Sequence, residues 1–170
     1  MLDTKVMSDP HTRPRPGSAA VVLIDVQRDT YADGAPLHVP GTAEAIPAIA
    51  RLATAFRERG RPIVHAVRWP REHVTYKPRW GAFYPTDLQR HLDESGSDTS
   101  VFAGCNFPNC PRTSIYEASE RDFRIVLVSD AMSGVYDRGM EECRAIGVDV
   151  RNLSSTLAWL EQEGPQRLRA

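Results

Sequence analysis

The 170-residue sequence has very little lysine: Lys5 and Lys77 stand against 19 arginines. The basic residues form no stripe along the chain, and the formal net charge of −1 gives nucleic-acid binding no support. No apolar run approaches the length of a membrane span, and the polar, proline-rich start lacks the apolar centre of a signal peptide. No glycine-rich phosphate loop follows a predicted strand, so a dinucleotide or P-loop role is unsupported. We therefore expect neither nucleic acid nor membrane as a partner.

Cysteine is also scarce. The three cysteines are odd in number and lack the paired spacing of zinc sites, so we expect a reducing, cytoplasmic environment. The length and the ordinary composition, 41% hydrophobic and 25% charged, fit one domain with a sizeable core. We expect residues 1–17 to be a mobile arm and residues 18–165 to form that domain.

Strand and helix patterns alternate after this arm. Residues 19–26, AAVVLIDV, are nearly continuous in their apolar character, as in a strand buried on both faces of a parallel sheet. The alternation predicts an α/β fold of three α-β-α layers around a Rossmann-like, mostly parallel sheet of about five to six strands. Further strands are predicted over 62–67, 100–103, 123–128 and 148–150, and helices over 42–59, 86–92, 111–121, 138–145 and through Trp159.

Cys110 closes a turn between a predicted strand and a predicted helix. The apolar residues 101–103 end at Gly104, a short turn rich in asparagine and proline follows, and Cys110 stands directly before Pro111. Because proline is favoured at the first helical position, we expect Cys110 to be the N-cap of a helix running to about Arg121. Unpaired amides and the helix dipole would favour the thiolate there, which indicates a nucleophile. The alternative is a small buried residue in a turn.

Two further residues suit the chemistry of a reactive thiol. Asp25 interrupts an apolar run, in LIDVQRD, where a carboxylate must be paired or functional. Lys77 is the mid-chain lysine, a compact charge that can stabilise a thiolate. Together with Cys110 they supply what amide hydrolysis by a thiol requires, and backbone N–H groups of the turn could form an oxyanion hole. The alternatives are a structural aspartate that binds loop amides and a solvated surface lysine.

The motifs around these residues resemble a known family. LIDVQRD, KPRWGAF, AGCNFPNC and FRIVLVSDAMSG follow one another as in the isochorismatase-like cysteine hydrolase superfamily, which includes nicotinamidases, N-carbamoylsarcosine amidases and related amidohydrolases. The resemblance extends over most of residues 18–160. It implies that Asp25, Lys77 and Cys110 form a catalytic triad.

The resemblance also implies details of the turn before the cysteine. A cis peptide bond would fall at Cys105–Asn106, and the amides of Asn106 and Cys110 would form the oxyanion hole. Two positions depart from the family pattern. The serine of its S-A-F element is Gly81 here, a mild change, and the usual Thr-Asn or Thr-Asp of the turn is Phe107-Pro108, which indicates an altered pocket wall.

Other side chains near these motifs are candidates for the substrate pocket. Arg79 and Arg112 are candidates to hold a substrate carboxylate, although surface positions suit them equally. Cys105 is expected in the pocket wall, Cys143 in helix packing, and Asp130 in fixing a loop. The pocket candidates, with surface or core positions as the alternative, are Gln27, Trp80, Phe83, Tyr84, Phe107 and Arg112.

The link between the second predicted strand and Lys77 is short. Arg68 and Lys77 are nine positions apart, where many relatives carry a long lid and, in nicotinamidases, an Asp-x-His metal pair. We find no Asp-x-His here and expect His73 to be a surface or pocket-rim residue, so neither metal nor cofactor is predicted. The short link predicts an open pocket or one completed by a partner subunit; alternatively, a deletion leaves the site inactive.

These observations give one leading hypothesis and two alternatives. The leading one is a cysteine hydrolase that cleaves a small amide or carbamoyl C–N bond through a thioester. The first alternative is vinyl-ether hydrolysis of an isochorismate-like substrate, although such family members generally lack the cysteine. The second is a catalytically impaired family member. By resemblance, we also expect a homo-oligomer, a dimer or tetramer.

Overall fold

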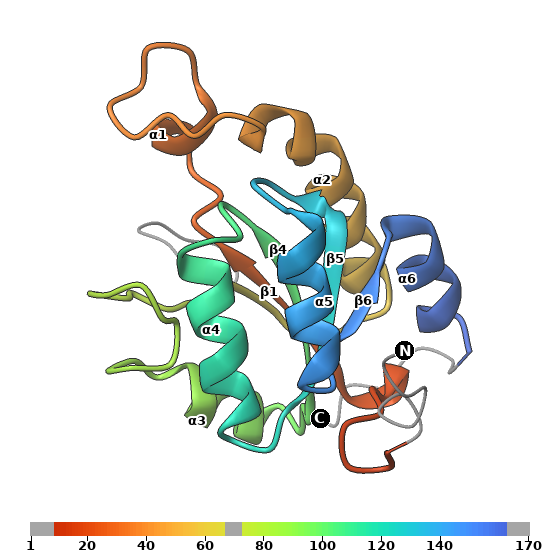
Figure 1. Cartoon of the computed structure of the whole chain (residues 1–170). Coiled ribbons are helices and arrows are strands. Elements are labelled where there is room, and N and C mark those ends of the chain that lie inside the picture. Colours follow the sequence, from red (N-terminus) through yellow and green to blue (C-terminus); the bar gives the residue numbers. More distant parts are fainter. Residues whose placement is uncertain (1–8, 67–72, 163–170) are drawn as a thin grey trace.

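The described residues of the computed structural model, 9–66 and 73–162, form one α/β unit built on a six-stranded parallel sheet. The strand order is β3-β2-β1-β4-β5-β6 (Figure 1). The predicted three-layer fold is confirmed. The strands are β1 (Ala19–Ile24), β2 (Ile63–Ala66), β3 (His73–Val74), β4 (Thr99–Gly104), β5 (Arg124–Met132) and β6 (Asp149–Arg151).

The sheet has a core on each face because successive strand residues point to opposite sides. In β1, Ala20, Val22 and Ile24 belong to the core under α3, α4 and α5, whereas Val21 and Leu23 belong to the core under α2 and α6. Figure 1 shows α4 and α5 lying across one face of the sheet. The helices are the 3₁₀ turn η2 (Pro16–Ser18), α1 (Arg28–Tyr31), α2 (Thr42–Glu58), α3 (Leu88–Glu94), α4 (Cys110–Ser119), α5 (Asp137–Ala145) and α6 (Leu153–Leu160).

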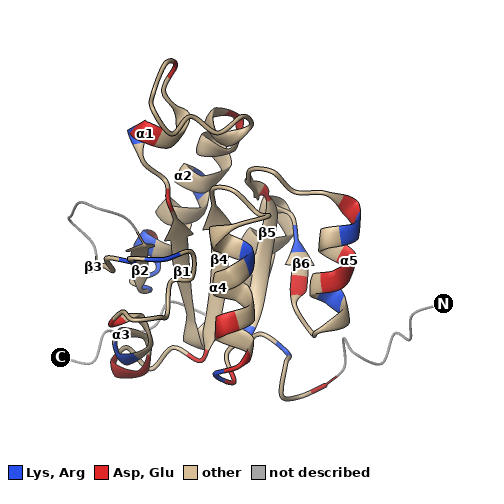
Figure 2. Cartoon of the chain, turned by 60° about the vertical axis from the view of Figure 1, so that its left-hand side comes forward, with Lys and Arg blue, Asp and Glu red and all other residues tan. Residues whose placement is uncertain are grey.

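The strand order reverses between β1 and β4. From β1 the chain proceeds outward through β2 and β3, then returns to the other side of β1 to begin β4. Ligands of such sheets bind at the carboxyl ends of the strands next to this reversal. β1 and β4 carry no charged residue and are tan in Figure 2, so charge begins only where β1 ends.

Three features of the fold go beyond the predicted elements. β5 continues to Met132 rather than ending at 128, with a register shift opposite the stretch from Phe102 to Gly104. The two-residue strand β3 and the four-residue helix α1 are too short to give a periodic pattern. The described part of the predicted arm, residues 9–17, contacts the domain: Arg15 pairs with Asp98 at 3.1 Å, and Pro16 is buried. Residues 1–8 lie outside the described residues.

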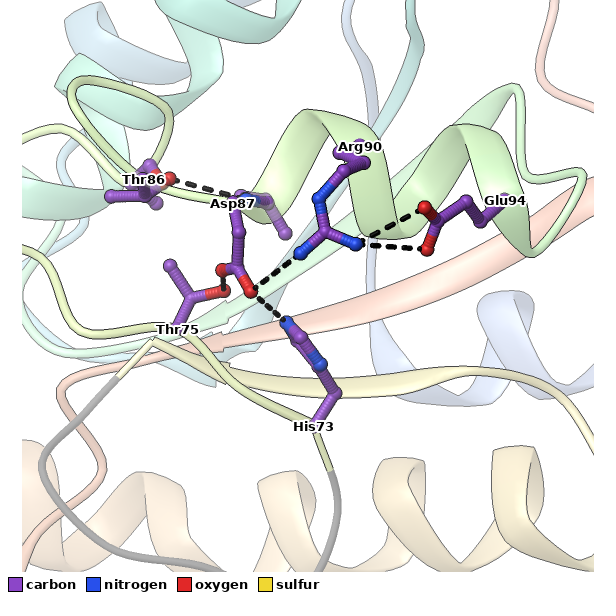
Figure 3. A network of polar contacts seen from close by, with 8 residues as sticks. His73, Thr75, Thr86, Asp87, Arg90 and Glu94 are labelled. Carbon is purple, nitrogen blue, oxygen red and sulfur yellow. Dashed lines mark hydrogen bonds and ion pairs between the residues drawn. The ribbon is translucent and has the colours of Figure 1, made fainter.

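A polar network joins β3 to α3, from residues on either side of Lys77 in the chain (Figure 3). The Asp87 carboxylate accepts a hydrogen bond from the Thr75 hydroxyl at 3.0 Å and lies 3.4 Å from His73 Nε2. The His73 ring stacks on His91, with the centroids 3.6 Å apart. His73, expected at the surface or a pocket rim, therefore lies in a helix–strand contact.

The sequence contains no apolar run of the length of a membrane span. In the structure, none of the described helices is long and apolar enough to cross a membrane.

Gly104 provides a test of how closely β4 approaches β1. Its φ is +127°, and a Cβ there would lie 2.1 Å from the Ile24 carbonyl oxygen. We expect Gly104→Ala to lower the free energy of unfolding by roughly 3 kcal/mol or more, since strain and a backbone clash combine. Thermal and urea unfolding measure the loss.

Gly96→Ala is the matched control, because Gly96 has φ +67° but open space around its Cβ position. Backbone strain alone predicts a loss of about 1–2 kcal/mol there. Equal losses in the two variants would contradict the close approach.

The His73–His91 stack predicts acid sensitivity. Burial and the neighbouring His73 hold the pKa of His91 below its ordinary 6.5. The unfolded chain then binds more protons than the folded chain, so this residue's contribution to stability falls as pH drops below about 6.5. We expect His91→Phe, which keeps a stacking ring, to flatten the fall in melting temperature between pH 7 and 5. An unchanged pH dependence in this variant would contradict the prediction.

Candidate active site

Asp25 is the first residue after β1 and has an unusual backbone conformation. Its φ is +51°, in the left-handed region that residues other than glycine rarely adopt. The Asp25 carbonyl accepts hydrogen bonds from the Gln27 N–H at 3.0 Å and from the Thr30 hydroxyl at 3.0 Å. These contacts turn the chain sharply after the strand and fix the aspartate at the switch point. Thr30 gave no sequence signal, because its role depends on this turn.

Lys77 is brought to Asp25 from the loop after β3. Lys77 Nζ lies 2.8 Å from Asp25 Oδ2, and the two side chains are 9% and 23% exposed. A second contact, at 3.5 Å, joins Nζ to the Arg79 carbonyl oxygen. An ion pair this deeply placed depends on its geometry, because both charges have lost most of their water. The structure thus brings together two of the three predicted catalytic residues by a direct contact.

Cys110 stands at the start of α4 and is the first helical residue, preceded by Asn109 as N-cap. The prediction that Cys110 itself is the N-cap was wrong by one position, and α4 ends at Ser119 rather than near Arg121. Pro111 is instead the second helical residue, where its missing N–H also costs nothing because the first-turn amides have no partner within the helix. The side chain is a free thiol, 8% exposed.

The charges around Cys110 do not favour a resting thiolate. Burial, together with the hydrogen bond and charge of Asp25, raises the pKa of the Cys110 thiol to about 11, and Lys77 only partly opposes this. The expectation of a low thiol pKa is therefore wrong. Burial would lower the pKa of Lys77, but the hydrogen bond and charge of Asp25 raise it above 10.5. Around neutral pH the site holds a protonated thiol beside an aspartate–lysine ion pair.

Two backbone amides at the turn before Cys110 have no acceptor among the described residues. They are the N–H groups of Asn106 and Cys110, whereas the intervening Phe107 N–H donates to the Ser133 carbonyl at 2.8 Å. These are the two amides predicted as oxyanion donors, and that role stays a prediction. The expected cis peptide at Cys105–Asn106 is not found; the described chain has no cis peptide there, in keeping with the large preference for trans before residues other than proline.

The predicted pocket residues lie in different environments. Phe107 is fully buried in the core, where its ring meets Tyr136 edge-on at 5.5 Å between centroids. Phe83 is 5% exposed and packs on Phe123. Trp80 is 64% exposed, and Gln27 is the half-buried N-cap of α1. Tyr84, also named as a pocket candidate, is 66% exposed. Their contact with a substrate stays a prediction.

Arg112 is held by side chains of α4 and by α5 with its preceding turn. Its guanidinium contacts Glu142 at 2.5 Å and the hydroxyls of Tyr136 at 2.5 Å and Tyr116 at 3.4 Å. The hydrogen bond with Tyr116 raises the pKa of Arg112, and Glu142 adds to this. A role in binding a substrate carboxylate would require these contacts to open.

The remaining predicted residues have simpler outcomes. Asp130 accepts a hydrogen bond from the Leu153 N–H at 2.6 Å and fixes the start of α6, as expected of a loop-fixing residue. Cys143 is fully buried in α5, which confirms its packing role. Cys105 is 3% exposed. Arg68 and the rest of the shortened link, residues 67–72, lie outside the described residues. Among the described side chains, no group of three or more His, Cys, Asp or Glu could hold a metal ion.

Two residues of α4 that the sequence did not single out contact the loop after Lys77. Ser114 Oγ accepts a hydrogen bond from the Ala82 N–H at 3.0 Å, and Glu117 Oε2 accepts one from the Phe83 N–H at 2.9 Å. They follow Cys110 by four and seven positions, a spacing that places all three on one helix face. That spacing was the available signal, but it does not say what the face meets.

Comparison with known proteins identifies this arrangement. The Isochorismatase domain model matches residues 19–71 and 66–151, and the two segments overlap at the shortened link. The chain belongs to the isochorismatase family. Within this family, it is 27% identical to an isochorismatase family protein of Desulfovibrio vulgaris, whose structure superposes with a TM-score of 0.78 over 85% of this chain and 98% of that one.

Two curated proteins are also similar to this isochorismatase family member. A maleamate amidohydrolase of Pseudomonas putida is 25% identical over 66% of this chain and 71% of its own length. A probable inactive nicotinamidase of Arabidopsis thaliana is 23% identical over 85% of this chain and 96% of its own. The chain is thus similar both to a protein named as an amide hydrolase and to one named as inactive.

The electrostatics of the site predict how the thiol titrates. We expect the rate of Cys110 alkylation by iodoacetamide to rise with pH up to about 11, the raised pKa of the thiol. Asp25→Asn should lower this pKa, since it removes the charge that opposes the thiolate. Lys77→Met should raise it. Peptide mass spectrometry separates Cys110 from Cys105 and Cys143. An alkylation profile with an ordinary thiol pKa in the wild type, unchanged in both variants, would contradict the geometry.

Proposed function

We propose that the protein is a cofactor-independent hydrolase of a small amide or carbamoyl substrate, with Cys110 as nucleophile. The observation that carries this proposal is the 2.8 Å ion pair between Asp25 and Lys77, whose two groups both act on the Cys110 thiol. A protonated thiol next to a carboxylate is the arrangement needed for general-base activation of a nucleophile. Its place at the switch point of the sheet adds support.

The proposed first half-reaction transfers the acyl group to sulfur. Asp25 takes the thiol proton as the sulfur attacks the carbonyl carbon, so the raised thiol pKa is overcome during the step rather than before it. The carbonyl oxygen becomes an oxyanion that accepts hydrogen bonds from the amides of Asn106 and Cys110. Asp25 then gives its proton to the departing nitrogen, the C–N bond breaks, and a thioester remains.

The second half-reaction removes the acyl group. Asp25 takes a proton from a water molecule whose oxygen attacks the thioester carbonyl, the C–S bond breaks, and the sulfur regains a proton. The acid leaves and the site returns to its starting state. Lys77 stays protonated throughout, because its raised pKa keeps the charge that balances Asp25 and the developing thiolate.

An amide substrate is supported by the comparison with maleamate amidohydrolase. The vinyl-ether alternative has less support, because Cys110 is present. The impaired alternative is suggested by the relative named as inactive and makes a different prediction, namely that no amide is turned over.

The proposal is tested with a panel of small amides. We expect the wild type to release ammonia from at least one of maleamate, nicotinamide and an N-carbamoyl amino acid. Cys110→Ala should lower kcat/KM by about a thousandfold or more, because it removes the covalent route. Intact-protein mass spectrometry after rapid acid quench should detect the acyl-enzyme.

Cys143→Ala is the matched control, since it removes a buried thiol from α5 without touching the ion pair. It should retain activity. Full hydrolysis by Cys110→Ala would contradict the covalent mechanism, and the absence of turnover across a wider amide panel would favour the impaired alternative.

A further inference from the structure

Two of the contacts that hold the loop carrying Lys77 lead to the site. One is the ion pair of Lys77 with Asp25, and the second is a set of hydrogen bonds to the face of α4 that begins with Cys110. The helix that presents the nucleophile therefore also holds the segment that presents the lysine. The second attachment does not involve the ion pair.

The α4 attachment consists of hydrogen bonds to consecutive backbone amides. Ser114, fully buried, accepts from the Ala82 N–H and donates to the Cys110 carbonyl at 2.7 Å. Glu117 accepts from the Phe83 N–H. The Ser114 hydroxyl thus connects the backbone of the nucleophile directly to the backbone of the lysine loop. A carboxylate acceptor makes the stronger of the two bonds to the loop.

Gly81 is what admits the Glu117 carboxylate. A Cβ at Gly81 would lie 2.2 Å from Glu117 Oε2, so a side chain at this position requires the carboxylate to move. The absence of serine from this position, a departure from the family pattern, is therefore matched by a glutamate that occupies the space.

We propose that Glu117 and Ser114 are positioning residues that hold Lys77 in register with Asp25 and Cys110, and that Gly81 is required for the Glu117 contact. This rests on the proposed function for its catalytic meaning, but the positioning itself is measurable without a substrate. The reporter is the Cys110 thiol, on which Asp25 and Lys77 act in opposite directions.

The test compares Glu117→Ala with Gly81→Ala by following alkylation of Cys110 with iodoacetamide at pH 9. Both variants break the same contact, one by removing the carboxylate and one by displacing it. We expect each to slow alkylation by about threefold or more, because a displaced Lys77 no longer favours the thiolate and one pKa unit is tenfold in thiolate. The double variant should be no slower than either single one.

Three further variants make the outcome decisive. Glu117→Gln keeps an acceptor oxygen for the Phe83 amide and should behave like the wild type. Glu120→Ala removes an exposed charge from the residue directly after α4 and should have no effect. In a Lys77→Met background, Glu117→Ala should change nothing further, because the positioning acts through Lys77. Circular dichroism confirms that each variant is folded.

The results that overturn the proposal are equally specific. Faster alkylation in Glu117→Ala would show that the contact shields Cys110 rather than positions Lys77. If Glu117→Gln and Glu117→Ala slow alkylation equally, the charge of Glu117 is responsible rather than its hydrogen bond. If Glu117→Ala still slows alkylation in the Lys77→Met background, packing is responsible rather than the position of Lys77. The expected pattern without amide turnover would uphold the positioning and reject the proposed function.

Discussion

The approach of β4 to β1 at their carboxyl ends is the constraint on which the site depends. Gly104 pairs with Ile24 so closely that a Cβ would meet the Ile24 carbonyl oxygen at 2.1 Å. Asp25 is the next residue after Ile24, and the turn to Cys110 begins directly after Gly104. Asp25 and the turn to Cys110 therefore lie close together because the backbones of β1 and β4 are in contact at this point. A larger residue at 104 would separate them along with the strands.

The electrostatics of the site follow from two opposite charges and a neutral thiol under partial burial. The thiol, with its pKa raised to about 11, is kept protonated by burial and Asp25, beside the ion pair of Asp25 with Lys77. Removing one partner of such a pair leaves the other charge uncompensated, so Lys77 supports the fold whatever its part in the proposed reaction. Lysine suits this role because a single ammonium can face both a carboxylate and a thiol, whereas the planar guanidinium of arginine is built for paired acceptors.

The sequence was sufficient for the fold because the buried strands are apolar and the helices periodic. It also named Asp25, Lys77 and Cys110 as candidates, since a buried carboxylate, a rare lysine and a cysteine beside a helix-starting proline are unusual locally; the structure brings Lys77 to Asp25, and the catalytic roles stay a prediction. The direction in which the pKa of Cys110 shifts was not predictable from the sequence. It depends on burial and Asp25, which raise the pKa, outweighing Lys77, which lowers it. The partners of Arg112 were equally hidden, because Glu142 approaches only when α5 packs beside α4. β3 was too short to detect.

The departures from the family pattern separate into two kinds. Gly81 lies inside the apparatus that holds the reactive groups, and its missing side chain is answered by the Glu117 carboxylate in the same space. The short link before Lys77 is of the other kind, and it lies outside the described residues. Gly81 and Glu117 act as a pair, because the carboxylate that fills the space beside the glycine also accepts a hydrogen bond from the Phe83 N–H. A larger residue at position 81 therefore requires a change at position 117, so the compensation lies within the chain.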